Sequence, residues 1–536
     1  MHRVSLVLLG VTWLCLLVVG ATLTVEYYDG FEYLMTGMAV AGEGTYFFPK
    51  NPVLSSILSA VFRVLEILHL DARSLANYHL PLIVLNLGLS LIVARWIRLF
   101  CPLLSTVTIA AMLCFNRSFI HHVPFALPDV LIACSIGIWW YADTTLPMRT
   151  PAGKVSRILI LGLCALQRPQ TVIIPAASLL TAIFKDRSKV ASATQIVLGS
   201  LTVYIALNTV FFYQGVNLSY EGGLSSLGTQ PDLMQAITGP FSFLYYYFGR
   251  PLSYPTLRVA PEGALWAYVG AIIDVLTPIG TGLLVLGVLQ LRKFRQSALW
   301  NGALEGVLIG SVGFFIFLLF VRAIGPVRYI TPVLPALALL QCLGLAWLAR
   351  KRAILGTLAL VGVFCFSVVP EVRHFYHPYY RADLEHRTTR SIIEWNPSEP
   401  TFFTGSALSP FYSEENVVHD FQPDFYSYRG MPAFIFYSGR RLSYLGQDPT
   451  FQNYGFPIPD NLENMMEQDK TLIIPPVRVH EGTLVPWESP SVPPGTQVTP
   501  LYTLRWSPDR APDKPCSPMV PGICVEVHTP SPNTVF

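Results

Sequence analysis

Three carboxylates follow the first apolar run of this chain at close spacing. Glu26, Asp29 and Glu32 lie within residues 26–33, which read EYYDGFEY. A carboxylate at the edge of a bilayer can act as a general base, a metal ligand or a proton relay. A solvated loop edge is the simpler interpretation. The aromatic residues between the acids favour a loop held at the membrane interface, although aromatic belts occur at any membrane boundary.

A second acidic candidate is Asp129, which follows Pro128 and opens a later apolar run. Its carboxylate can serve chemistry, or it can simply stabilise the start of a helix, where the helix dipole favours an anion. His121 and His122 lie shortly before it. The two histidines can contribute to a metal site, but positions at the membrane interface are the favoured interpretation.

Three arginines, Arg168, Arg322 and Arg328, lie at or within the ends of apolar runs. The charge distribution described below places them on the non-cytoplasmic side, where few cations are expected. A guanidinium at this depth needs an anion. That anion can be a protein carboxylate, the side chain can extend to lipid headgroups, or the arginines can bind a phosphate, for which the guanidinium fork is suited.

The composition indicates that the elements positioning these residues are membrane helices. Hydrophobic residues make up 52% of the 536 residues and charged residues 13%, with a mean hydropathy of +0.47. A soluble domain carries about 25% charged residues. The net charge of +3 does not indicate nucleic-acid binding.

Eleven apolar runs are candidate spans, although several are shorter than the ~20 residues that a spanning helix needs. They are 5–24, 79–97, 101–115, 125–142, 156–167, 171–185, 192–213, 264–290, 302–321, 327–348 and 353–371.

Lysine and arginine are concentrated at every second connection between these runs, which predicts the orientation of the chain. The basic connections begin at Arg3 and recur near residues 95–98, 149–157, 185–189, 292–295 and 350–352. The N-terminus is therefore expected in the cytoplasm. The other connections, including loops 25–78 and 214–263, are expected outside. Within the first loop, residues 53–70 have the spacing of an amphipathic helix lying on the outer membrane surface.

The segment 372–536 contains no spanning run and is rich in proline and polar residues. We expect two parts, a transmembrane domain over 1–371 and a soluble α/β domain over 372–536. Helix-like residues 381–395 alternate with short strand-like runs. The strand-like runs are 401–404, 433–437 and 471–474, and the proline-rich segment 475–515 is expected to be irregular.

Nine cysteines are present, and none forms a CxxC pair, which argues against a zinc or redox site of that kind. Seven lie in apolar stretches. Cys516 and Cys524 lie in the tail, where an oxidising compartment would permit a disulfide. The sequence leaves open whether they pair.

Together these motifs resemble the GT-C glycosyltransferases, polytopic enzymes that use polyprenyl-phosphate-linked sugars, and in particular the bacterial branch similar to protein mannosyltransferases and the aminoarabinose transferase. The resemblance covers most of the chain and depends on the order of individually weak motifs. The matching segments are Asp29–Tyr33, Gly42–Tyr46 with Asn51-Pro52, Pro128-Asp129, Arg168-Pro169, Arg328–Pro332 with Pro335, and Phe436–Arg440. Relatives often have adjacent Asp and Glu in the first loop, whereas here Asp29 and Glu32 are three residues apart.

The resemblance implies a multi-pass membrane protein of GT-C type with about eleven helices and an extracytoplasmic C-terminal α/β domain, in a bacterial inner membrane. It implies inverting transfer of a sugar to a lipid, glycan or protein acceptor, with Asp29 as the general base. Glu32 and Asp129 would orient the acceptor, or ligate a divalent cation if one is used. Arg328, Arg168, Arg322 and Tyr329 would bind the lipid phosphate. A transporter or flippase for a lipid-linked or anionic solute is the alternative, against which the lack of an internal repeat argues.

Overall fold

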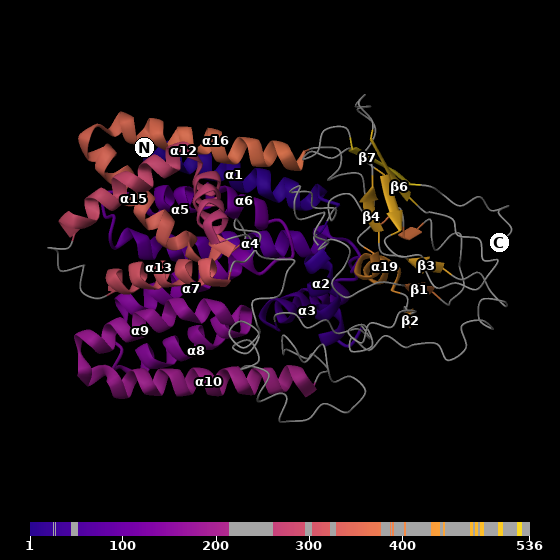
Figure 1. Cartoon of the computed structure of the whole chain (residues 1–536), viewed down its shortest axis with the longest axis horizontal. Coiled ribbons are helices and arrows are strands. Elements are labelled where there is room, and N and C mark those ends of the chain that lie inside the picture. The colour runs from indigo at the N-terminus through magenta and orange to yellow at the C-terminus, as the bar shows by residue number, and fades with distance from the viewer. Residues whose placement is uncertain are drawn as a thin grey trace. The chain divides into compact units, whose positions relative to one another are not determined.

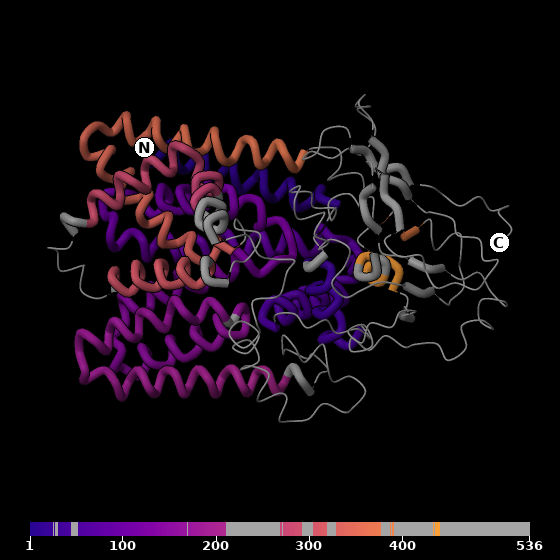
Figure 2. The backbone as a smooth tube through the Cα atoms, viewed as in Figure 1, coloured from indigo at the N-terminus to yellow at the C-terminus, as the bar shows by residue number. Residues whose placement is uncertain are grey.

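A computed structural model describes the chain in segments, traced in Figure 2. The described residues are 1–24, 26, 28–43, 52–213, 261–294, 303–321, 329–376, 386, 389–390, 401–403, 430–439, 443–444, 472–474, 477–480, 483–486, 502–506 and 523–527. These residues belong to two compact units. Unit 1 comprises 1–21, 79–210 and 257–373, and unit 2 comprises 22–78, 211–256 and 374–536.

Unit 1 is helical, and each of the eleven expected spans contains a helix (Figure 1). Six helices in the described part are long and apolar enough to cross a membrane: His2–Thr22, Ala76–Arg98, Arg187–Val210, Ile272–Leu291, Thr331–Lys351 and Ala353–Phe375. Gln170–Lys185 and Leu304–Leu318 are shorter apolar helices. The chain is therefore a multi-pass helical membrane protein, whereas the total of eleven spans and the orientation remain predictions.

The helix boundaries follow local capping chemistry. The helices of unit 1 are α1 (His2–Thr22), α4 (Ala76–Arg98), α5 (Thr106–Cys114), α6 (Arg117–His122), α7 (Asp129–Thr145), α8 (Pro151–Gln167), α9 (Ile173–Lys185), α10 (Val190–Tyr213), α12 (Pro261–Phe294), α13 (Ala303–Val321), α15 (Leu334–Lys351) and α16 (Ala353–Phe375). Short 3-10 turns, η1 (Pro169–Val172), η2 (Arg187–Lys189) and η7 (Thr331–Val333), connect some of them. The Ser105 hydroxyl accepts from the Thr108 amide at the start of α5, and Thr150 caps α8 in the same way.

Close packing between helices depends on small residues. A Cβ at Gly344 of α15 would lie 2.1 Å from the Leu283 carbonyl of α12, and a Cβ at Gly287 would lie 1.9 Å from the Leu340 carbonyl. Only glycine allows the two backbones to approach this closely. Helix α12 also bends at Thr277, where φ is 63° and ψ is 164°, directly before Pro278. The courses of α12 and α15 can be followed in Figure 2.

Unit 2 combines first-loop helices with short strands of the tail. Helix α2 (Tyr28–Val40) packs against α3 (Pro52–Ile67), which confirms the helix expected over 53–70. Its placement on the membrane surface remains a prediction. The tail contributes α19 (Gly430–Ser438) and the strands β1 (Thr401–Phe403), β2 (Ser443–Tyr444), β3 (Leu472–Ile474), β4 (Val477–His480), β5 (Thr483–Pro486), β6 (Tyr502–Trp506) and β7 (Ile523–Val527). One parallel sheet has the order β2-β1-β3, and β4-β5 and β6-β7 are antiparallel pairs.

Two expectations for the tail were wrong. Residues 433–437 were expected to form a strand but belong to helix α19. Pro432 lies near the start of this helix, and Gly439 follows its end with φ +70°. Proline is favoured in the first turn of a helix and glycine directly after its last turn. The segment 475–515 was expected to be irregular but contains β4, β5 and β6. Of its prolines, only Pro486 belongs to one of these strands, as the last residue of β5, where proline removes few ladder hydrogen bonds.

Candidate functional site

The acidic motif of the first loop lies at the start of α2. Asp29 is the second residue of this helix; the structure describes its backbone. The side chains of Glu26 and Glu32 are buried. A Cβ on Gly30 would lie 2.2 Å from Oε1 of Glu26, so the Glu26 carboxyl occupies the space that glycine leaves open. Because the N-terminal end of a helix favours anions, this location stabilises the carboxylates of the motif.

Aromatic residues of the tail cover α2. The Phe31 ring of α2 lies 5.6 Å from that of Phe436 and 5.8 Å from that of Tyr437, and Tyr78 lies 6.0 Å from Phe436. Such pairs add about 0.5–1.5 kcal/mol beyond the area they bury. Within unit 2, Phe436 and Tyr437 of the tail therefore pack beside Phe31 of the acidic loop motif, a contact that the sequence did not indicate.

Arg73 fixes the end of α19 in this position. Its guanidinium donates to the Phe436 carbonyl at 2.5 Å and to the Ile435 carbonyl at 3.3 Å, both in the last turn of the helix. Cations are favoured at this end of a helix. A Cβ at Gly439 would lie 3.1 Å from the guanidinium, so the residue after α19 also needs to be small. Burial lowers the pKa of Arg73, but the group remains a cation at neutral pH.

A second cluster, in unit 1, brings three sequence-predicted residues together. Nη2 of Arg168 lies 3.2 Å from Oδ1 of Asp129, and the Arg168 guanidinium lies over the Tyr329 ring, 5.3 Å from its centre. Asp129 is 0% exposed and the Arg168 side chain 12%. Of the alternatives that the sequence left open for Arg168, the structure shows pairing with a protein carboxylate. The planar guanidinium of an arginine is also suited to binding an anion such as a phosphate.

Local sequence explains how these residues converge. Arg168 precedes Pro169, which disfavours helical geometry in the residue before it. Arg168 is accordingly extended, with φ −159° and ψ 99°, and lies in the break between α8 and η1. Asp129 follows Pro128 as the first residue of α7. The expected helix-start position is therefore confirmed, and it does not exclude a chemical role.

A charged network beside α6 was not anticipated from the sequence. Nε of Arg117 donates to Oε1 of Glu371 at 2.8 Å, and the guanidinium also pairs with Asp274. Nδ1 of His121 lies 3.3 Å from the other oxygen of Glu371. Asp274 and Glu371 lie in largely apolar helices, α12 and α16, and acids in such helices are the signal that could have revealed the network. Its contacts join α6, α12 and α16.

The neighbouring His122 has a structural partner. Its Nδ1 lies 2.7 Å from the Ser118 carbonyl oxygen, and the Ser118 hydroxyl lies 2.7 Å from that of Thr331 in η7. Among the described residues, no group of three or more His, Cys, Asp or Glu side chains is arranged to hold a metal ion.

Several predicted site residues lie outside the described residues. Arg322 and Arg328 are among them, as is the side chain of Asp29. Asp29 belongs to unit 2, whereas Arg328 belongs to unit 1. The expectation that Asp29 and Arg328 share one cavity remains a prediction, as does pairing of Cys516 with Cys524.

The helices of unit 1, which carry the Asp129–Arg168–Tyr329 cluster, define a polytopic helical membrane protein. The structure is similar to that of ArnT from Cupriavidus metallidurans bound to undecaprenyl phosphate, with a TM-score of 0.58 and 14% sequence identity over 87% of this chain and 92% of that one. The apo state of the same protein gives a TM-score of 0.56 at 14% identity and the same coverage. The chain therefore shares the fold of ArnT, as the resemblance of the sequence implied.

A more distant similarity is to the archaeal oligosaccharyltransferase AglB from Archaeoglobus fulgidus, in complex with an inhibitory peptide and a dolichol-phosphate. The TM-score is 0.46 at 11% identity, over 75% of this chain and 62% of that one. No protein-family model matches the chain, and no curated protein matches it by sequence.

Proposed function

We propose that this protein is a membrane glycosyltransferase that moves a sugar from a polyprenyl-phosphate donor to an acceptor on the extracytoplasmic face. The observation that carries the proposal is the fold shared with ArnT, a protein whose structure holds undecaprenyl phosphate, over 87% of this chain. The acidic and basic motifs occur on this fold in the order that the sequence resemblance implied. The protein would lie in a bacterial inner membrane, with its N-terminus cytoplasmic and segment 372–536 outside.

In the proposed reaction, Asp29 removes the proton of an acceptor hydroxyl as its oxygen attacks the anomeric carbon. The bond from that carbon to the phosphate oxygen breaks, and polyprenyl phosphate leaves with the bonding electrons. Attack opposite the leaving group inverts the anomeric carbon. General-base assistance contributes about 10²–10⁴-fold in rate. Asp29 lies in the first turn of α2, with the buried Glu32 three residues further along the helix.

Charge develops on the departing phosphate, and the arginines would stabilise it. Arg168 is suited to this role because its guanidinium lies over the Tyr329 ring and pairs with Asp129. Arg322 and Arg328 are proposed to complete the phosphate site. Glu32 and Asp129 would orient the acceptor, or ligate a divalent cation if the reaction uses one.

The alternative is a transporter or flippase for a lipid-linked anion, since many helices and buried arginines also fit that class. The two functions differ in whether the sugar–phosphate bond breaks. Purified protein in vesicles would be given a panel of polyprenyl-phosphate sugars with lipid and glycan acceptors, and products would be identified by mass spectrometry. Release of polyprenyl phosphate with a glycosylated acceptor supports the transferase. Movement of intact donor across the vesicle supports the transporter.

The base is tested by Asp29→Asn with Asp71→Asn as the matched control. Asp71 lies in the same loop, is exposed, and accepts from the Arg73 amide through Oδ1 at 2.8 Å, a bond that an asparagine oxygen can also accept. Asp29→Asn is expected to lower transfer by at least about 100-fold, and Asp71→Asn is expected to leave it unchanged. Full transfer by Asp29→Asn would remove Asp29 from the role of base.

A further inference from the structure

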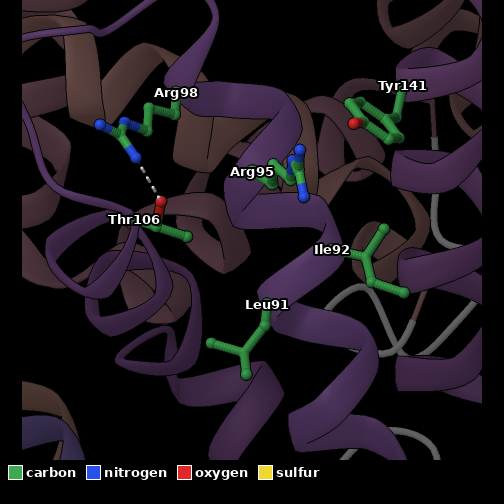
Figure 3. Close-up of a pocket in the computed structure, with 6 residues that line it drawn as sticks. All are labelled: Leu91, Ile92, Arg95, Arg98, Thr106 and Tyr141. Atoms are coloured by element: carbon green, nitrogen blue, oxygen red, sulfur yellow. Dashed lines mark hydrogen bonds between the residues drawn. The ribbon is translucent and has the colours of Figure 1, made fainter.

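A cavity of about 530 Å³ lies in unit 1, beside the last two turns of α4. It is lined by residues of three helices or their starts (Figure 3): Leu91, Ile92, Arg95 and Arg98 from α4, Thr106 from α5 and Tyr141 from α7. None of these six residues takes part in the acidic or Asp–Arg–Tyr clusters.

The lining changes from apolar to cationic along one face of α4. Leu91 and Ile92 are 37% and 40% exposed, although both are large and apolar. Arg95 and Arg98 follow at helical spacing on the same exposed face, whereas the residues at 93, 94, 96 and 97 are buried. An apolar surface that is followed one turn later by cations is complementary to a lipid. The acyl chains of the lipid would lie along the apolar part and its anionic headgroup beside the cations.

Among the described residues, no acidic side chain lines the cationic end of the cavity. In the part of the chain that the structure describes, neither arginine forms an ion pair. Arg98 donates to the Thr106 hydroxyl at 3.3 Å, which holds the guanidinium beside that hydroxyl (Figure 3). Two guanidinium groups beside two hydroxyl-bearing side chains form a set of donors that suits phosphate oxygens.

The depth of the site also fits a lipid. The candidate span containing α4 ends at Arg98, so the arginines lie where an apolar helix reaches the headgroup region. The distribution of lysine and arginine predicts that this end is cytoplasmic. Anionic phospholipids give the cytoplasmic leaflet its negative surface potential.

We propose that this cavity binds an anionic phospholipid of the cytoplasmic leaflet, with its phosphate between Arg95 and Arg98 and its acyl chains along Leu91 and Ile92. The site is separate from the proposed transfer chemistry and does not depend on it. The binding is non-covalent, and the phosphate diester supplies both the charge and the oxygen acceptors.

The full-length protein in detergent would be titrated with phosphatidylglycerol or phosphatidylcholine of identical acyl chains, and bound lipid counted by native mass spectrometry. The test variant is Arg95→Gln/Arg98→Gln. The matched control is Arg350→Gln/Arg352→Gln, which removes the same charge from two exposed arginines on the same predicted side. Arg95→Gln alone is the milder variant, because the Arg95 side chain forms no hydrogen bond or ion pair with the described residues. Elution as a single species on size exclusion checks folding.

Each arginine near a membrane surface contributes about fivefold to binding of anionic lipid, so the test variant is expected to lose roughly thirtyfold in phosphatidylglycerol affinity. Arg95→Gln is expected to lose about fivefold. The control variant and the binding of phosphatidylcholine are expected to stay unchanged.

Three results would overturn the proposal. The first is an equal loss in the control variant, which would indicate attraction by net charge alone. The second is unchanged phosphatidylglycerol binding in the test variant. The third is displacement of the lipid by glycerol phosphate at an equal concentration, which would identify a site for free phosphate rather than for a lipid.

Discussion

Replacing Asp129 by asparagine would leave the Arg168 guanidinium without the carboxylate that lies 3.2 Å from it. Asparagine keeps the size of the side chain and one oxygen acceptor, so the change removes charge with little change in volume. Asp129 is buried and Arg168 nearly so. The protein must then either hold a cation in a poorly solvated place or rearrange the break between α8 and η1.

The magnitude follows from the distance and the burial. Two unit charges at this separation attract by about 5 kcal/mol at an effective dielectric constant of about 20, before desolvation is subtracted. Removal of one partner of a buried pair typically costs about 3–5 kcal/mol, because the other charge is left uncompensated. The position of Asp129 in the first turn of α7 adds about 0.3–1 kcal/mol from the helix dipole. We therefore expect Asp129→Asn to lower the free energy of unfolding by about 3–5 kcal/mol.

A double-mutant cycle separates the pair from the rest of the fold. Asp129→Asn, Arg168→Gln and the double variant would be unfolded in detergent by a denaturant and followed by tryptophan fluorescence. The double variant removes both charges, so it is expected to be more stable than the sum of the single losses predicts, by about 1–3 kcal/mol. A coupling free energy below about 0.5 kcal/mol would show that the two groups do not interact as described.

The same variants test whether Arg168 also serves the lipid phosphate. If the pair is purely structural, the double variant recovers stability and sugar transfer together. If Arg168 stabilises charge on the departing phosphate, stability recovers while transfer remains low, because loss of a preorganised donor costs about 10²–10³-fold in rate. Recovery of both properties would refute the proposed phosphate contact.

Three further outcomes can be measured. Arg157→Ala should destabilise the protein by about 3–5 kcal/mol in the same denaturant assay, and Arg157→Lys by less. The reason is that the buried guanidinium pairs with a carboxylate and with several carbonyls at the end of α7. Equal losses of stability in the two variants would contradict this. Gly344→Ala should lower the melting temperature because its Cβ would meet the backbone of α12. Gly282→Ala should not, because a Cβ at Gly282 would meet nothing within 4 Å. Hydrogen bonds from the Ser188 hydroxyl and amide hold the pKa of Asp186 below its ordinary value. The ionised carboxylate therefore stabilises the turn at residues 186–188 at any pH above the pKa that Asp186 has in the unfolded chain. This stabilisation is lost as the pH falls through the lower pKa that Asp186 has in the folded protein. Amide-exchange protection of Ser188 should fall with pH accordingly, and Asp186→Asn should abolish that pH dependence.

Helix existence was predictable because apolar runs in a membrane protein have few alternatives to a helix. Helix ends were less predictable, since they depend on individual caps. The run expected over 101–115 forms a helix only from Thr106, where Ser105 supplies the cap. The predicted break near Arg168-Pro169 was correct because the residue before proline is restricted by local sterics.

The tail was less predictable because its short apolar runs carry no clear period. Residues 433–437 are consecutive apolar and aromatic residues, a pattern that fits a buried strand and a buried helix equally. The decision comes from residues outside the run. Arg73 of the first loop binds the last carbonyls of α19, and Phe31 of α2 packs on Phe436. These partners are distant in sequence, so no local pattern could indicate them.

The candidate site shows the same division between local and distant information. Alternation of helix direction places every second connection on one side of a membrane, so the sequence could group Asp129, Arg168 and Tyr329 on one side. That grouping could not determine whether the arginine faces a carboxylate or a free phosphate, because the choice depends on side-chain distances. Pairing and phosphate binding need not exclude each other, since one guanidinium has five N–H donors and the pairing with Asp129 joins Nη2 to Oδ1 at 3.2 Å. A carboxylate that anchors the arginine before the donor arrives would reduce the reorganisation needed in the transition state. The double-mutant stability cycle and the transfer assay would be applied to the wild type, Asp129→Asn, Arg168→Gln and the double variant. Together they separate the anchoring of Arg168 by Asp129 from a catalytic contribution of Arg168.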